Sequence, residues 1–167
     1  MILFHGSNAE VSNIDLSRCG KYKDFGQGFY LTSLKQQATD WAKKITKRFR
    51  TGNATLNKYE FNNNLNDLNC MIFTEPNEEW AAFIINNRNR NFANHSDRLS
   101  NHDNKYDFVH GLVANDDISA ILETFLLGIL PMSELSLALN YKELNDQYSF
   151  HSVKALSHLK FLGSETL

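Results

Sequence analysis

The sequence predicts a single α+β domain. Its 167 residues are enough to bury a substantial core, and they contain no internal repeat and no linker. Short apolar runs typical of strands alternate with segments of helical periodicity that carry capping signals. The strand-like runs are spread over the whole chain, so strands and helices should belong to one unit.

Seven short runs bounded by turn residues predict strands. They cover residues 1–4, 29–31, 56–61, 70–73, 106–114, 147–150 and 159–162. Gly26 and Gly28 permit a tight turn before the second of these strands. In that strand Tyr30 faces away from Phe29 and Leu31, because neighbouring side chains of a strand alternate between its faces. The run 106–114 predicts a central strand.

Capping signals and helical spacing predict the helices. Ser33 and Gln36 form a capping-box pattern at the start of a helix that runs to about Phe49. Pro76 starts the next helix, in which Trp80 has the spacing of a core residue. Further helices are predicted over residues 117–127, 133–141 and 151–158. The polar stretch 86–105 predicts a long loop, in which Arg88 and Arg90 are most simply solvated.

Composition excludes several classes of protein. The two cysteines, Cys19 and Cys70, fit neither a disulfide framework nor a metal motif, so we expect a reducing cytoplasm. No signal peptide is recognisable. The longest apolar stretch, residues 118–130, is too short to span a bilayer and is interrupted by Glu123. The six histidines include no helical pair at ligand spacing, so no metal site is expected.

Three pieces in the first part of the chain can together build a pocket for a nicotinamide ring. His5-Gly6-Ser7 follows the first strand, where a glycine lets a flat ligand approach main-chain groups that pair with a carboxamide. Tyr30 and Trp41 supply two rings that can flank a positively charged pyridinium through stacking and cation–π attraction. Each piece alone is more often a turn or, for Trp41, a core position. Their conjunction in this order predicts the pocket.

These motifs resemble those of the diphtheria-toxin and poly(ADP-ribose) polymerase branch of the ADP-ribosyltransferases. That branch combines a His-Gly-Ser/Thr strand, a Gly-x-Gly-(Ile/Phe)-Tyr strand and a second aromatic residue in the next helix. Segments 106–117 and 146–150 also resemble a narrower group of small bacterial proteins that form a domain of unknown function. The resemblance implies a split antiparallel or mixed β-sheet core with flanking helices, and NAD as co-substrate.

The resemblance implies a role for each residue of the site. His5 would bond a hydroxyl of the adenosine ribose, Gly6 would contact the carboxamide, and Tyr30 would stack on the nicotinamide ring. Trp41 stands where the family usually has a second tyrosine, and it keeps the stacking surface. The implied NAD contacts are His5, Gly6, Ser7, Gly28, Phe29, Tyr30, Thr32 and Trp41. The implied catalytic residues are His5, Tyr30 and Gln147.

Gln147 is the largest departure from the family, which has a glutamate at this position. Cleavage of the nicotinamide–ribose bond passes through an oxocarbenium-like state, which a glutamate stabilises. A glutamine still bonds a ribose hydroxyl but carries no charge and cannot act as a base. Losing such a contact commonly costs ~10²–10³-fold in rate. We therefore expect mono-transfer, weak catalysis, or a carboxylate borrowed from Asp24, Asp116, Asp117 or Glu123, with the adjacent aspartates more simply explained as helix caps.

A basic cluster interrupts an otherwise mildly acidic chain. The formal charge is −2 and the pI is near 6.3, which argues against a generally basic surface. The cluster comprises Lys43, Lys44, Lys47, Arg48 and Arg50 at the end of the first helix. A solvated face with cations near a helix C-terminus explains it. The alternative is a surface for NAD phosphates or for a nucleic-acid acceptor.

The predicted function is therefore NAD-dependent mono-ADP-ribosyl transfer to a macromolecular acceptor, either a protein or a nucleic acid. By analogy with small bacterial toxins, an antitoxin protein is an expected partner, and no membrane partner is expected. Two alternatives share the pocket. One is a module that binds NAD or ADP-ribose without turnover, and the other is an NAD glycohydrolase.

Overall fold

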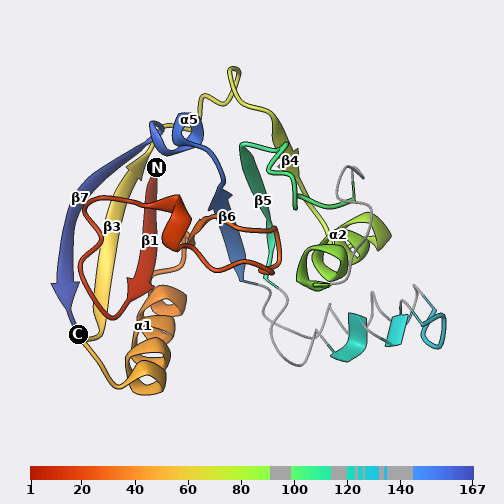
Figure 1. Cartoon of the computed structure of the whole chain (residues 1–167), viewed down its shortest axis with the longest axis horizontal. Coiled ribbons are helices and arrows are strands. Elements are labelled where there is room, and N and C mark those ends of the chain that lie inside the picture. The colour runs from red at the N-terminus through yellow and green to blue at the C-terminus, as the bar shows by residue number, and fades with distance from the viewer. Residues whose placement is uncertain (91–98, 114–119, 123, 126, 132–133, 135–144) are drawn as a thin grey trace.

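Two β-sheets lie next to each other with helices around them in the computed structural model (Figure 1). The structure describes residues 1–90, 99–113, 120–122, 124–125, 127–131, 134 and 145–167. The three-stranded sheet is antiparallel and has the order β1 (Ile2–Ser7), β3 (Thr55–Phe61), β7 (Leu159–Thr166). The four-stranded sheet has the order β2 (Phe29–Leu31), β6 (Asp146–Phe150), β5 (Phe108–Leu112), β4 (Cys70–Ile72). Only β4 and β5 pair in parallel, which confirms the α+β class with a mixed sheet.

The helices flank the sheets. Helix α1 (Lys35–Phe49) packs on β1, and helix α2 (Glu78–Arg88) covers the four-stranded sheet. A 3-10 turn, η1 (Leu16–Arg18), and a short helix, α5 (Val153–Leu156), complete the named elements. The side chain of Asn77 caps α2 by accepting from Trp80 N at 2.9 Å. Neither α1, α2 nor α5 has the length and apolar character needed to cross a bilayer.

The predicted capping box of α1 is wrong. The N-cap residue is Leu34, and no side chain caps this end of the helix. Ser33 instead donates its main-chain N–H to Asp146 Oδ1 at 2.9 Å, and its hydroxyl donates to Asp146 Oδ2. A carboxylate from β6 therefore takes the hydroxyl that the local sequence reserves for the helix. The predicted end of the helix, Phe49, is confirmed.

Apolar side chains form two core clusters on opposite faces of the four-stranded sheet. One lies between the two sheets, where Phe61 of β3 meets Phe108 and Phe150 at centroid distances of 5.6 and 5.3 Å. The other lies under α2, where Trp80 and Phe83 are fully buried. The prediction of Trp80 as a core residue is confirmed. Strands β5 and β6 are therefore covered on both faces, and β5 is central in its sheet, as predicted.

A single antiparallel bridge joins the two sheets within the described residues. Phe4 N–H donates to Thr32 O at 2.8 Å, and Thr32 N–H donates to Phe4 O at 2.9 Å. Because alternate residues of a strand direct both main-chain groups to the same side, the N–H and C=O of Gly6 also point away from β3 and toward β2. Continuing the register of the bridge places Gly6 opposite Tyr30. The two strands separate there, so the fold contains an opening between Gly6 and Tyr30.

The limits of several predicted elements differ from those observed. Strand β7 extends to Thr166 rather than ending at residue 162, and β5 is shorter than the predicted run 106–114. The predicted helix 117–127 is described only in part, and residues 120–122 and 124–125 are helical. Most of the predicted helix 133–141 lies outside the described residues, as do Asp116, Asp117 and Glu123.

Candidate functional site

Tyr30 lies at the opening and is tied to the preceding turn through its hydroxyl. The hydroxyl donates to Gly26 O at 2.6 Å and accepts from Phe25 N at 3.1 Å. As predicted, the ring faces away from Phe29 and Leu31, which lie in the core between the sheets. Burial, with a smaller effect of the Asp24 charge, raises the pKa of the phenol well above its ordinary value. Tyr30 is therefore a neutral, oriented ring and not a base.

His5 is bonded to the same residue from β1. Its Nδ1 lies 2.8 Å from Tyr30 O, and its ring packs on Phe29 at a centroid distance of 4.4 Å. A carbonyl oxygen only accepts hydrogen bonds, so Nδ1 carries the proton and Nε2 is left as an acceptor. Burial lowers the pKa of His5, which keeps the ring neutral. His5 thus offers one acceptor nitrogen, suited to a hydroxyl donor.

Gly6 is required by the packing of α1. A Cβ atom on Gly6 would lie 2.0 Å from Ala38 O and 2.8 Å from Ala42 N. The face on which the sequence suggested room for a flat ligand is therefore filled by the helix backbone. The N–H and C=O of Gly6 lie in the plane of the sheet and take no part in the ladder with β3. These main-chain groups, and not the missing Cβ, are what Gly6 contributes to the opening.

Gln147 shares a sheet face with Tyr30. It pairs with Gly111 of β5, and Tyr30 pairs with Ser149, two residues further along β6. Directly paired residues project to the same face, so Tyr30 and Gln147 are diagonal neighbours. The Gln147 Nε2 is buried and has no hydrogen-bond partner among the described residues. Leaving such a donor unpaired costs about 1–3 kcal/mol, so this amide is a candidate ligand group.

Asp146 holds the three elements around the opening together, and the sequence gave no sign of this role. Its Oδ1 accepts from the Thr32 hydroxyl at 2.6 Å and from Ser33 N, so β6 is fixed to the end of β2. Its main-chain oxygen accepts from Gln37 Nε2 at 3.3 Å, which fixes β6 to α1. The positions of Tyr30, Gln147 and α1 are therefore coupled through one residue.

Trp41 lies on the same face of α1 as Gln37, one turn further along the helix. Its side chain is 41% exposed, so the core alternative for Trp41 is wrong. Its ring lies under Lys44 Nζ, 5.6 Å from the ring centroid. No direct ring contact joins Trp41 and Tyr30 within the described part of the chain. Trp41 as the second wall of a nicotinamide slot stays a prediction.

His151 is a buried residue beside the site for which the sequence suggested no role beyond a metal search. Its Nδ1 lies 2.8 Å from Gln27 O, and its Nε2 lies 2.9 Å from Ser149 Oγ. Burial lowers the pKa of His151 to about 4. A Cβ atom on Gly28 would lie 2.6 Å from His151 Nδ1, so the glycine leaves room for this ring. Gly28 thus supports the site from behind.

The remaining predicted residues have structural contacts. Phe29 and Thr32 are buried, and Ser7 pairs with Thr55 in the β1–β3 ladder. Asp24, a candidate for a borrowed carboxylate, accepts from Arg88 Nη2 at 2.8 Å. Arg88 is therefore not a solvated loop residue, because it ends α2 and fixes the turn that leads to Tyr30.

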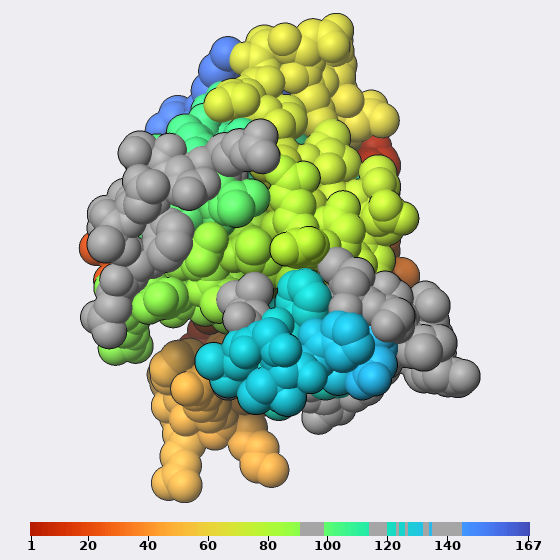
Figure 2. Space-filling view, turned by 90° about the vertical axis from the view of Figure 1, so that its right-hand side faces the viewer, coloured from red at the N-terminus to blue at the C-terminus, as the bar shows by residue number. Residues whose placement is uncertain are grey.

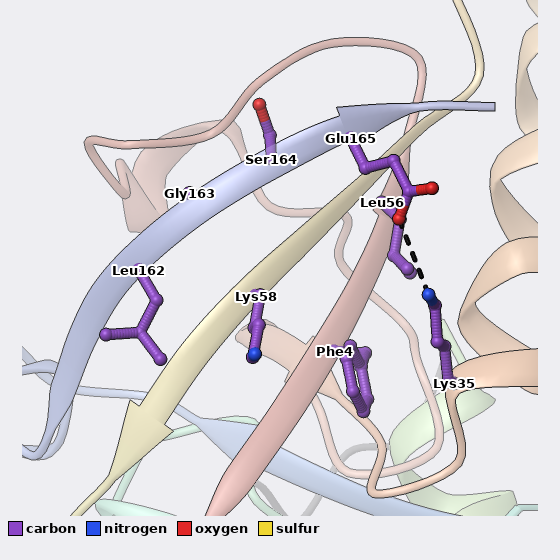
Figure 3. A pocket seen from close by; sticks show the side chains of 8 residues that line it. All are labelled: Phe4, Lys35, Leu56, Lys58, Leu162, Gly163, Ser164 and Glu165. Atoms are coloured by element: carbon purple, nitrogen blue, oxygen red, sulfur yellow. Dashed lines mark hydrogen bonds and ion pairs between the residues drawn. The ribbon is translucent and has the colours of Figure 1, made fainter.

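A separate hollow of about 370 Å³ lies on the outer face of the three-stranded sheet (Figure 3). Phe4 and Lys58 project into it from β1 and β3, and an ion pair of 3.4 Å between Lys35 and Glu165 lies at one side. None of the residues predicted to contact NAD lines this hollow. It is therefore distinct from the opening between Gly6 and Tyr30.

The chain matches one family model, described as "Protein of unknown function (DUF3990)", over residues 1–161. It belongs to this family. No curated protein and no solved structure matches the chain. The described residues include no group of three histidine, cysteine, aspartate or glutamate side chains that could hold a metal ion. Because the family description names no activity, the function has to be argued from the residues around the opening.

Proposed function

We propose that this protein is an NAD-dependent mono-ADP-ribosyltransferase. The observation that carries the proposal is the unpartnered, buried Nε2 of Gln147 on the sheet face of Tyr30, next to an opening edged by the main-chain groups of Gly6. A carboxamide needs one donor and one acceptor, which Gly6 offers. A ribose hydroxyl needs an acceptor or a donor, which His5 Nε2 and Gln147 Nε2 supply. The family resemblance assigns NAD to residues at these positions.

The same residues limit the chemistry. In the proposed reaction the bond between the ribose and nicotinamide breaks, and its electron pair leaves with nicotinamide as a neutral molecule. The acceptor atom forms the new bond to the ribose and releases its proton to solvent. Neutral Gln147 orients the ribose but cannot take that proton, so the acceptor must need little activation. This favours single transfer over chain extension.

The deciding experiment follows two products. The pure protein is incubated with NAD and a cell lysate, and both free nicotinamide and labelled ADP-ribose on macromolecules are measured. The proposal expects both signals. Nicotinamide without transferred label would mean an NAD glycohydrolase. The missing charge at Gln147 favours a second candidate, a module that binds NAD or ADP-ribose without turnover, and binding with neither product would establish it.

Removing either predicted ring should weaken NAD binding, as measured by calorimetry. Tyr30→Ala should abolish binding because it removes one wall of the slot. Trp41→Ala should also weaken binding, at little cost in stability because its ring is largely exposed. Tyr30→Phe is the matched control, since it loses the bonds to Gly26 and Phe25 but keeps the ring. Unchanged affinity in both alanine variants would contradict the assignment.

Gln147→Glu should increase nicotinamide release by up to ~10²–10³-fold, because a carboxylate stabilises the developing positive charge of the ribose. The control is Gln147→Met, which keeps the length of the side chain. That variant should fold as well as the wild type, because it removes an unsatisfied buried amide, but it should release less nicotinamide. Equal rates in all three proteins would show that this side chain does not face the ribose.

A further inference from the structure

Positive charge is concentrated on the second half of α1. Within residues 35–50 there are six of the 17 basic residues of the chain and a single acidic one, Asp40. Lys43, Lys47, Arg48 and Arg50 are exposed, and none of them takes part in an ion pair within the described ranges. We call Trp41, Lys43, Lys44, Lys47, Arg48 and Arg50 the α1 basic surface.

The α1 basic surface is presented on a helix end that projects from the molecule. Ala38 and Ala42 are the residues of α1 that pack on β1, and the last turn lies beyond them. Phe49, at the same helical face as Ala42, is 60% exposed, so the sheet no longer covers this turn. Figure 2 shows α1, in orange, standing out from the rest of this side of the molecule.

This projecting end is held in place by the loop that follows it. Arg50 adopts the left-handed conformation (φ 53°), and its N–H donates to Thr46 O at 2.8 Å. Asn8 clamps the next residues, since its amide donates to Thr51 O at 3.0 Å and its carbonyl accepts from Asn53 N at 3.0 Å. The cations therefore stand on a fixed support, which reduces the entropy lost when they bind a partner.

One row of this surface starts at the proposed site. Gln37, Trp41, Lys44 and Arg48 follow each other at helical spacings of four, three and four residues, which places them along one face. Gln37 donates to the main chain of Asp146, the residue before Gln147. A chain-like ligand that follows this row therefore runs between the projecting end of α1 and the opening.

We propose that the α1 basic surface binds single-stranded nucleic acid and that, resting on the proposed function, this nucleic acid is the acceptor. Cations that track a phosphate backbone, combined with an exposed ring on which a base can stack, are the pattern of such binding. The cations extend over two helical turns, further than the linked phosphates of one NAD molecule reach. An acidic protein would pair with the cations but would have no use for the exposed ring.

The test measures the binding of labelled single-stranded RNA and DNA by fluorescence anisotropy across a salt series. The variant combines Lys43→Gln, Lys47→Gln and Arg48→Gln, and the matched control combines Lys21→Gln, Lys58→Gln and Lys160→Gln, three exposed lysines outside α1. Each phosphate contact adds about 0.7 to the slope of log affinity against log salt, so losing three should weaken binding roughly 100-fold near 0.1 M salt. The control should bind like the wild type.

Nicotinamide release from NAD is measured on the same proteins, which separates this inference from the proposed function. Wild-type rates in the α1 variant, together with its lost binding, support the inference. Equal binding by the α1 variant and the control would overturn it, as would lysate label found only on protein after nuclease treatment. A loss of nicotinamide release in the α1 variant would also overturn it, because the cations would then serve NAD. Strong nucleic-acid binding by a wild type that releases no nicotinamide leaves the surface standing and refutes only the transfer.

Discussion

Gly6→Ala should destabilise the protein by about 3 kcal/mol or more, a large share of the stability of a typical domain. The added methyl group would lie 2.0 Å from Ala38 O, which belongs to the helix backbone and cannot rotate away. Helix α1 would have to shift off β1 and expose the buried contacts of Ala38 and Ala42. Urea denaturation followed by circular dichroism measures this loss.

Gly20→Ala is the matched control for this change. Its added Cβ would meet only the end of the Lys23 side chain, at 3.0 Å from Cε, and that flexible chain can move. We expect its free energy of unfolding to stay within about 0.5 kcal/mol of the wild type. If Gly6→Ala were as stable as Gly20→Ala, the close packing of α1 on β1 would be refuted.

The free energy of unfolding should fall by about 2 kcal/mol between pH 7 and pH 5 because of His151 alone. The pKa of His151 is lowered to about 4 in the folded protein, against about 6.5 in an unfolded chain. Between these values the unfolded chain binds more protons, so acid favours unfolding. Burial also lowers the pKa values of His5 and His110, which act in the same direction.

His151→Gln isolates this contribution. A glutamine can still donate to Gln27 O and pair with the Ser149 hydroxyl, but it does not titrate. Urea denaturation at pH 7 and at pH 5 should therefore show a smaller loss of stability in the variant than in the wild type. Identical losses in the two proteins would mean that His151 is not kept neutral by burial.

The strands could be predicted from the sequence because their patterns are local. Alternation and apolar runs indicate β3 and β6 to within a residue, and the turn at Gly26 and Gly28 indicates the direction of Tyr30. The start of α1 could not be predicted, because the carboxylate that takes Ser33 comes from a residue 113 positions later in the chain. A local capping pattern cannot reveal such a competitor.

The candidate site was predictable in its residues but not in their reasons. Gly6, Tyr30 and Gln147 are named by their motifs, yet only the packing shows that Gly6 is small because of α1 and that the Gln147 amide is left unpaired. His151 escaped notice because its partner, Gln27, is 124 residues away. Nothing in the neighbouring sequence announces that contact.

Strand β7 lies at the outer side of the three-stranded sheet, and its free edge bears on how the protein stays dispersed. A long outer strand is a template for pairing with strands of other molecules. Here Gly163 has φ 135°, and the ladder to β3 shifts register beside it, between Lys58 and Tyr59. This break and the exposed charges of Lys160 and Glu165 interrupt the flat edge that fibril growth requires.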